Sequence, residues 1–261
     1  MGERELTLPR EIERLTAGCR RQRVTVGMSE SRTYRLTGDA GRFFLKHHAA
    51  DAVEKLRGEK ERIEWLRGKL PVPEVVLFAE DETGEYLLLT EIAGLDASEK
   101  AHERSLPQLI RLLAEGLRMV HGVPIADCPF DRTLAVVLAE AGRRTGLGLV
   151  DEDDFDTVRQ GRRAEDLYRE LLAGKPASED PVFTHGDYCL PNVVIREGRI
   201  GGFIDLGRAG IADRYQDLAL AARSIGYNFG AEHVPAFLDA YGLGEPDQAK
   251  IGYYQLLDEF F

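Results

Sequence analysis

The sequence has few cysteines and lacks the spacings that disulfide frameworks or zinc sites require. Its 261 residues include three cysteines, Cys19, Cys128 and Cys189, an odd number without a CxxC pair. Such cysteines are typical of a reducing cytoplasm rather than of a secreted, disulfide-linked chain. The longest apolar runs, such as AVVLA at 135–139, are far too short to span a bilayer. We therefore expect no membrane segment and no structural zinc.

Basic residues are also in the minority. The formal net charge is −11, so the phosphates of a nucleic acid would be repelled. Acidity of this size often serves solubility alone, but it also suits a cationic partner. The N-terminal stretch MGERELTLPREIER is charged throughout and lacks the apolar core of a signal peptide. We expect a cytoplasmic, monomeric protein that binds neither nucleic acid nor membrane.

The hydrophobic pattern changes its period along the chain. Residues 23–46 contain strand-like pieces separated by Gly27, Gly38 and Gly41, residues 50–69 have helical spacing, and two further strands meet at a turn at 82–84. Apolar residues at helical spacing from Leu106 to Val120 then predict a long helix. Helices are expected to dominate from there to the end of the chain, apart from one β-hairpin at 193–205.

These two patterns predict an α+β fold with two lobes. The N-terminal lobe, residues 1–92, would hold a small antiparallel sheet with one helix, and the C-terminal lobe, residues 93–261, would be mainly helical. A hinge is expected at about 90–95. Two unlike lobes joined by a short connector suggest a ligand cleft between them.

A carboxylate stands on the apolar stripe of the helix at 50–69. Glu59 lies three residues after Leu56 and four before Ile63, where burial is unfavourable unless a cation compensates the charge. Lys46 is the candidate, because it ends the run FFLK in which both faces of a strand are apolar. The pair could be purely structural, or the lysine could extend to solvent beside a solvated glutamate.

Three more polar residues accompany the hairpin. With its turn centred on residues 197–198, Asn192 and Asp205 become diagonal neighbours on one face. One carboxylate and one carboxamide oxygen suit a hard cation such as Mg²⁺ shared with substrate phosphates. Asp187 precedes them in the segment HGD and could receive the proton of a hydroxyl nucleophile. Each residue alone could equally be a cap or a turn residue.

Taken together, these residues resemble the protein-kinase-like fold in its small-molecule branch. The segments GKLPVP, DCPFD, FTHGD, FIDLGRAGIADRYQDLAL and LLDEFF follow one another in the order found in the aminoglycoside 3'-phosphotransferases, the kanamycin and neomycin kinases. The resemblance spans essentially the whole chain. A Lys two residues after the aspartate, usual in eukaryotic protein kinases, is replaced here by Cys189, and DFG and APE segments are absent from the sequence.

The resemblance implies a role for each of these residues. Lys46 would contact the α- and β-phosphates of ATP and pair with Glu59, Asn192 and Asp205 would hold Mg²⁺, and Asp187 would be the catalytic aspartate. The other implied positions are the phosphate-covering amides of Met28 and Ser29, the adenine-contacting main chain at Thr90 and Ile92, the structural His185, and Asp217 as a brace of the catalytic loop.

The substrate implied by the resemblance is a polycation, which requires acidic residues. The run DEDDFD at 151–156 usually indicates a solvated loop, and the terminal LLDEFF could simply be a packing helix. In the family, the corresponding positions bind substrate amines. The implied substrate residues are Asp153, Asp154, Asp156, Asp258, Glu259 and the terminal carboxylate of Phe261, with Arg223 orienting these acids and Arg208 lying near Asp187.

The resemblance therefore implies an enzyme that uses ATP and Mg²⁺ to phosphorylate the 3'-hydroxyl of aminoglycoside antibiotics and so confers resistance. One alternative is a kinase of another small hydroxylated metabolite or antibiotic on the same fold, which would not need the acids of DEDDFD. A second is a nucleotide-binding module without catalysis. The presence of Lys46, Glu59, Asp187, Asn192 and Asp205 together argues against that module.

Overall fold

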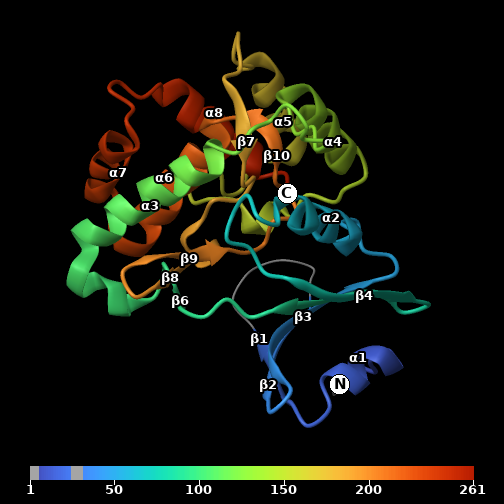
Figure 1. Ribbon diagram of the computed structural model, residues 1–261. Helices are drawn as coiled ribbons and strands as arrows, with labels where there is room; N and C mark the ends of the chain where they lie inside the picture. Colours follow the sequence, from blue (N-terminus) through green and yellow to red (C-terminus); the bar gives the residue numbers. More distant parts are fainter. Residues whose placement is uncertain (1–5, 25–31) are drawn as a thin grey trace. The chain divides into compact units, whose positions relative to one another are not determined.

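The computed structural model describes residues 6–24 and 32–261, and its chain divides into two compact units (Figure 1). The first unit comprises Met1–Ala93 together with Gly202–Gly207, and the second comprises Gly94–Gly201 and Arg208–Phe261. The short segment Gly202–Gly207 therefore belongs with the N-terminal part of the chain, although it is distant from it in sequence. The α+β class predicted from the sequence is confirmed.

The first unit is built on a five-stranded antiparallel sheet with the strand order β1-β2-β3-β5-β4. Two of its connections are two-residue turns, at Asp39–Ala40 and Glu82–Thr83, and the second lies at the turn predicted for 82–84. The strands are β1 (Arg20–Val24), β2 (Arg32–Gly38), β3 (Gly41–Ala49), β4 (Val75–Asp81) and β5 (Gly84–Thr90).

Two helices accompany this sheet, α1 (Arg10–Leu15) and α2 (Leu56–Leu66). Ile12 of α1 packs with Leu36, Leu45 and Leu88 of the sheet in one hydrophobic cluster. Helix α2 packs against β3, β4 and β5. It is shorter than the predicted 50–69: residues 50–55 form turns before it, and Gly68, at a φ of +77°, has a left-handed conformation that a helix cannot continue through.

The second unit is mainly helical, as predicted. The long helix expected from the stripe at 106–120 is α3 (Leu106–His121), whose apolar face is buried. Helix α3 packs against α7, α6 against α8, and α5 against α4 and α8. The other helices are α4 (Leu134–Gly146), α5 (Ala164–Ala173), α6 (Tyr215–Phe229), α7 (Val234–Tyr241) and α8 (Gln248–Asp258), with the 3-10 turns η1 (Lys100–Ser105), η2 (Glu152–Asp154), η3 (Leu190–Asn192) and η4 (Ala231–His233).

Short strands also belong to this part of the chain. A three-stranded sheet has the order β6-β8-β9, formed by β6 (Leu95–Asp96), β8 (Val193–Arg196) and β9 (Arg199–Phe203). Glu197 and Gly198 both have positive φ, so the β8–β9 turn is centred where the sequence placed it. The sequence did not indicate the pair β7 (Pro181–Thr184) and β10 (Gly210–Asp213), because four-residue strands carry little periodicity.

Within the described part of the chain, none of the helices combines the length and apolarity that a membrane crossing requires.

Candidate active site

In the first unit, a buried lysine contacts two carboxylates. Lys46 on β3 is 9% exposed and Glu59 on α2 is 5% exposed. The Nζ of Lys46 donates to both carboxylate oxygens of Glu59, at 2.6 and 2.9 Å. It also donates to Oδ1 of Asp205. The ion pair that the sequence predicted between Lys46 and Glu59 is thus confirmed, and Asp205 is an additional partner that the sequence did not reveal.

The charges of this group support one another. Burial opposes the charged form of Lys46, but Asp205 and Glu59 outweigh it and raise the pKa of the ammonium above its ordinary value. Burial raises the pKa of Glu59, and the nearby ammonium of Lys46 opposes that rise. Lys46 therefore stays protonated at neutral pH. Removing Lys46 would leave the buried carboxylate of Glu59 without a cation, which is strongly destabilising, and removing Glu59 would leave Lys46 with Asp205 alone.

Asp205 is held in an unusual backbone conformation. It follows β9 with a φ of +59°, in the left-handed region that Asp tolerates better than most residues. The amide of Phe203 donates to the carbonyl oxygen of Pro71 at 2.9 Å, which fixes the end of the strand just before it. The Asp205 side chain is 48% exposed while one of its oxygens accepts from Lys46. A carboxylate is thus presented to solvent with its charge already compensated.

The residues predicted to contact the nucleotide differ in what the structure shows of them. Met28 and Ser29 lie outside the described residues. The amide of Thr90 donates to the carbonyl oxygen of Glu74 at 3.0 Å, so this donor is already used within the sheet. Ile92 lies just beyond β5, in the connector. Its side chain packs against Gly202, because a Cβ atom added to Gly202 would lie only 2.5 Å from Cδ1 of Ile92. The carbonyl oxygen of Thr90 and the main chain at Ile92 therefore remain the predicted adenine contacts.

In the second unit, Asp187 follows β7 in a loop fixed by a buried aspartate. Asp217 on α6 accepts from the amide of His185 at 2.7 Å and from the amide of Gly186 at 2.9 Å. Gly186 has a φ of +82°, and a Cβ there would lie 2.2 Å from the carbonyl oxygen of Arg208, so only glycine fits. Nδ1 of the buried His185 accepts from the amide of Asp187 at 3.3 Å. The bracing role of Asp217 and the structural role of His185 are confirmed.

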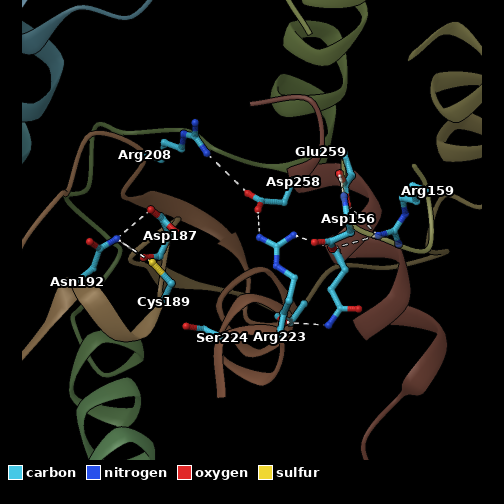
Figure 2. Close-up of polar contacts among 12 residues, drawn as sticks. Asp156, Arg159, Asp187, Cys189, Asn192, Arg208, Arg223, Ser224, Asp258 and Glu259 are labelled. Carbon is cyan, nitrogen blue, oxygen red and sulfur yellow. Dashed lines mark hydrogen bonds and ion pairs between the residues drawn. The ribbon is translucent and has the colours of Figure 1, made fainter. Parts of the chain in front are cut away.

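Asn192 and Cys189 both contact the Asp187 carboxylate. Nδ2 of Asn192 donates to Oδ2 of Asp187 at 2.9 Å and to its carbonyl oxygen at 3.0 Å (Figure 2). The same Nδ2 lies 3.2 Å from the sulfur of Cys189. Because the amide nitrogen faces Asp187, the carboxamide oxygen of Asn192 is turned the other way. That oxygen is the atom a hard metal ion would use.

The pKa of Asp187 is raised. The largest cause is burial, followed by the neighbouring carboxylate of Asp258, while Arg208 and Cys189 lower the pKa. Arg208 therefore lies near enough to influence Asp187, as the resemblance implied. A carboxylate with a raised pKa is a better proton acceptor than an ordinary aspartate, and such shifts are frequent at catalytic positions.

Next to Asp187 lies a group of acids that we name the carboxylate cluster: Asp156, Asp258 and Glu259 (Figure 2). Arg223 on α6 donates to Oδ2 of Asp156 at 3.3 Å and also pairs with Asp258, so it contacts two of the acids that it was predicted to orient. Nη1 of Arg208 lies 3.6 Å from Oδ1 of Asp258. The segment containing DEDDFD and the chain terminus thus contribute to one cluster, although more than a hundred residues separate Asp156 from Glu259.

Not every predicted acid joins this cluster. Asp153 and Asp154 lie in η2 and are exposed, and their segment is organised locally, with the amide of Asp153 donating to Asp151. Burial and the charges of Asp151 and Asp156 raise the pKa of Asp154. The charge of the cluster therefore affects Asp154. Among the described residues, however, no ion pair joins Asp154 to the cluster.

Two arginines in this region escaped the sequence analysis. Arg159 donates to Oε1 of Glu259 at 2.9 Å and lies 3.5 Å from Oδ2 of Asp156. The buried Arg144 donates to the carbonyl oxygens of Phe260 and Leu149, and so ties the chain end to the segment after α4. Asp156 and Arg159 are three residues apart, and this spacing could have indicated the contact between these two residues. An arginine in the last turn of a helix gives no such signal.

The end of the chain is also surrounded by cations. The guanidinium carbons of three arginines lie 5.4–5.9 Å from the centroid of the Phe261 ring, within range of a cation–π contact. They belong to Arg132, Arg144 and Arg208. Phe260 beside it is fully buried. The packing that the sequence analysis expected of the terminal residues is present, and it holds the last residue next to the carboxylate cluster.

Comparison with known proteins shows where this arrangement recurs. Residues 22–253 match the model of the phosphotransferase enzyme family named APH. A curated aminoglycoside 3'-phosphotransferase of Niallia circulans is 44% identical over 223 residues, covering 84% of this chain and 83% of the relative.

Comparison with solved structures points to the same family. The crystal structure of an aminoglycoside-3'-phosphotransferase of type VIII matches with a TM-score of 0.86 and 38% identity, over 94% of each chain. An aminoglycoside phosphotransferase of Streptomyces rimosus in complex with ADP and streptomycin matches with a TM-score of 0.79 and 26% identity, over 92% of each chain. From its sequence and its fold, the chain therefore belongs to the phosphotransferase enzyme family.

Proposed function

We propose that this protein is an ATP-dependent aminoglycoside 3'-phosphotransferase that confers resistance to kanamycin- and neomycin-type antibiotics. The observation that carries the proposal is the position of Asp187: a half-buried carboxylate, in a loop braced by Asp217, beside a cluster of acids that a polyamine would seek. Relatives named for this activity match along most of the chain. A kinase of an uncharged metabolite would have no use for these acids.

Asp187 acts on the sugar hydroxyl. Its carboxylate accepts a hydrogen bond from the 3'-hydroxyl and aims the oxygen at the γ-phosphorus. It receives the proton as the new P–O bond forms and the bond from the γ-phosphorus to the β,γ-bridging oxygen breaks, which releases ADP. Asn192 fixes the carboxylate through Nδ2, and Asp217 fixes the main chain on which it stands. Positioning of this kind contributes a large share of the rate in phosphoryl transfer, where little covalent chemistry falls to the protein.

The residues of the nucleotide side have the chemistry that a triphosphate needs. Lys46, held protonated by Glu59 and Asp205, supplies a cation for the phosphates. Asp205 in the first unit and Asn192 in the second each present an oxygen donor of the type that Mg²⁺ prefers. When bound, that ion would neutralise charge developing on the phosphates. We assign the adenine contacts to the carbonyl oxygen of Thr90 and the main chain at Ile92.

The amine side relies on ionised carboxylates. Asp156, Asp258 and Glu259 would pair with substrate ammonium groups. The exposed Asp153 and Asp154 would attract the polycation at longer range, since the chain as a whole carries a net charge of −11. We further place the protein in the cytoplasm as a monomer, in keeping with its three free cysteines.

A coupled assay of ADP release tests the proposal. Kanamycin and neomycin should each support ADP release, whereas tobramycin, which lacks the 3'-hydroxyl, should not. Phosphorus NMR of the kanamycin product should place the phosphoryl group on the 3'-oxygen. ADP release with tobramycin at a rate equal to that with kanamycin would refute the assigned position. Release with neither compound would refute the substrate class.

A further inference from the structure

The carboxylate cluster is already occupied by cations of the chain itself. Each of its three acids contacts an arginine: Asp258 pairs with Arg208 and Arg223, Asp156 with Arg223 and Arg159, and Glu259 with Arg159. The Glu259 side chain is only 4% exposed, and its second oxygen accepts from the amide of Asp156 at 3.0 Å. A ligand therefore cannot reach Glu259 while Arg159 stays in place (Figure 2).

The arginines around the cluster are held in different ways. Arg223 projects from the middle of α6 and pairs with two aspartates at once. Arg159 projects from the segment 155–163, which contains neither helix nor strand. Gly148, with a φ of +65°, precedes η2 and this segment, and Gly161, with a φ of +77°, lies within the segment two residues after Arg159. Arg159 can thus leave the cluster by a change in its turn as well as in its side chain, whereas the main chain of Arg223 is fixed in a helix and only its side chain can change.

The energetics favour exchange over simple departure. Removing Arg159 alone would leave the buried carboxylate of Glu259 without a cation, which is costly. An arriving ammonium group carries the same charge as the guanidinium and three N–H donors, enough for Glu259 and Asp156 together. The net charge of the cluster is then unchanged. The affinity of the cluster for an external amine is then set by the difference between its contact with that amine and its contact with Arg159. The contact with the amine alone does not determine it.

We propose that Arg159 is an internal counter-cation that a substrate ammonium group displaces from Glu259 and Asp156. The inference rests on the function proposed above and adds a specificity-determining residue to it. Arg159 keeps the cluster closed to inorganic cations and to small amines, which cannot make enough other contacts to drive the exchange. A polycationic substrate can, because its remaining ammonium groups and hydroxyls bind elsewhere at the same time.

The test compares two substitutions that remove the same charge from the same segment. Arg159→Gln removes the internal cation. Arg162→Gln is the matched control, since Arg162 pairs with the exposed Glu170 at 2.7 Å on α5, outside the cluster. Arg159→Lys retains a cation at the position. KM for kanamycin, KM for ATP and kcat are measured for each variant and for the wild-type protein, after thermal unfolding has verified the fold.

The exchange predicts that Arg159→Gln lowers KM for kanamycin about fivefold relative to Arg162→Gln, because the substrate no longer competes with an ion pair. KM for ATP should stay the same, and Arg159→Lys should restore a KM close to that of the wild type. A KM for kanamycin that rises in Arg159→Gln, or that equals the value for Arg162→Gln, would overturn the inference and leave the kinase assignment intact. A wild-type protein that phosphorylates no aminoglycoside would overturn both.

Discussion

The two units of the molecule solve the same problem, a buried carboxylate, in different ways. In the first unit, Glu59 is compensated by one cation, Lys46, and both stand on regular elements, a helix and a strand. In the second unit, Glu259 is compensated by Arg159, which stands on a segment without regular structure. The first pair is fixed by the elements that carry it, whereas the second can be exchanged.

This difference suits the two ligands. A nucleotide presents the same phosphates in every catalytic cycle, so in the function proposed above a lysine fixed by the sheet and by two carboxylates would serve as a permanent contact. Aminoglycosides differ in the number and position of their amines, so a cluster whose cations can be replaced by those of the ligand accepts more of them. The ion pair of the first unit is therefore rigid, whereas that of the second is exchangeable, and the experiments below test this contrast.

The largest effect is expected at Asp187. Asp187→Asn keeps the shape of the side chain and the contact with Asn192 but removes the proton acceptor, so kcat should fall about a thousandfold. Affinities for ATP and kanamycin, measured by calorimetry, should change little. A variant with more than a tenth of the wild-type turnover would show that Asp187 does not have the assigned role.

The buried pair of the first unit should come next. Glu59→Gln leaves Lys46 with half of its compensation and should destabilise the fold by about 3 kcal/mol. Lys60→Gln, on the same helix, breaks only the exposed pair between Lys60 and Glu64 and should cost about 0.4 kcal/mol or less. Urea unfolding of both variants measures the contrast. Equal losses would mean that burial of the Lys46–Glu59 pair carries no special weight.

A smaller effect is expected from the brace of the catalytic loop. Asp217→Asn weakens the charge-assisted hydrogen bonds to the amides of His185 and Gly186, worth about 2 kcal/mol, and should lower kcat about thirtyfold. Since Asp217 touches neither the nucleotide nor the amines in our assignment, KM for both substrates should remain close to the wild-type values. A rise in KM without a change in kcat would place Asp217 in substrate binding instead.

The pH dependence should give the smallest effect. Burial raises the pKa of Glu259 to about 7, so the side chain is largely neutral below that pH and charged above it. Because only the charged form pairs with an ammonium group, KM for kanamycin should fall about fivefold as the pH rises through this pKa. Steady-state kinetics from one unit below to one unit above it provide the profile. Glu259→Gln should flatten it, and an unchanged profile in that variant would assign the titration to another group.

Local patterns were sufficient for a large part of the structure. The period change after Thr90 predicted a sheet followed by helices, and the position of Glu59 on an apolar stripe predicted its ion pair with Lys46. The turn at Glu197 and Gly198 was also placed correctly, and its glycine is the residue type that adopts positive φ without strain. In each case the deciding information lies within a few residues of the chain, or in one polar residue among apolar neighbours.

Long-range pairings could not be read in this way. The contact of Lys46 with Asp205, the strand pair β7–β10 and the contact of Arg159 with Glu259 all join segments that the chain brings together only on folding. An arginine in a polar segment, or four apolar residues before a loop, has nothing in its local context that identifies a distant partner. The acids of DEDDFD show the same limit: only Asp156 joins the carboxylate cluster, and its neighbours at 153 and 154 remain exposed.

The division of labour between the units is tested most directly by measuring two affinities in two variants. ATP with Mg²⁺ and kanamycin are titrated separately, by calorimetry, into Lys46→Met and Asp258→Asn. We predict that Lys46→Met weakens ATP binding about tenfold and leaves kanamycin binding unchanged, and that Asp258→Asn does the reverse. Loss of kanamycin affinity in Lys46→Met, or of ATP affinity in Asp258→Asn, with the fold intact, would contradict it.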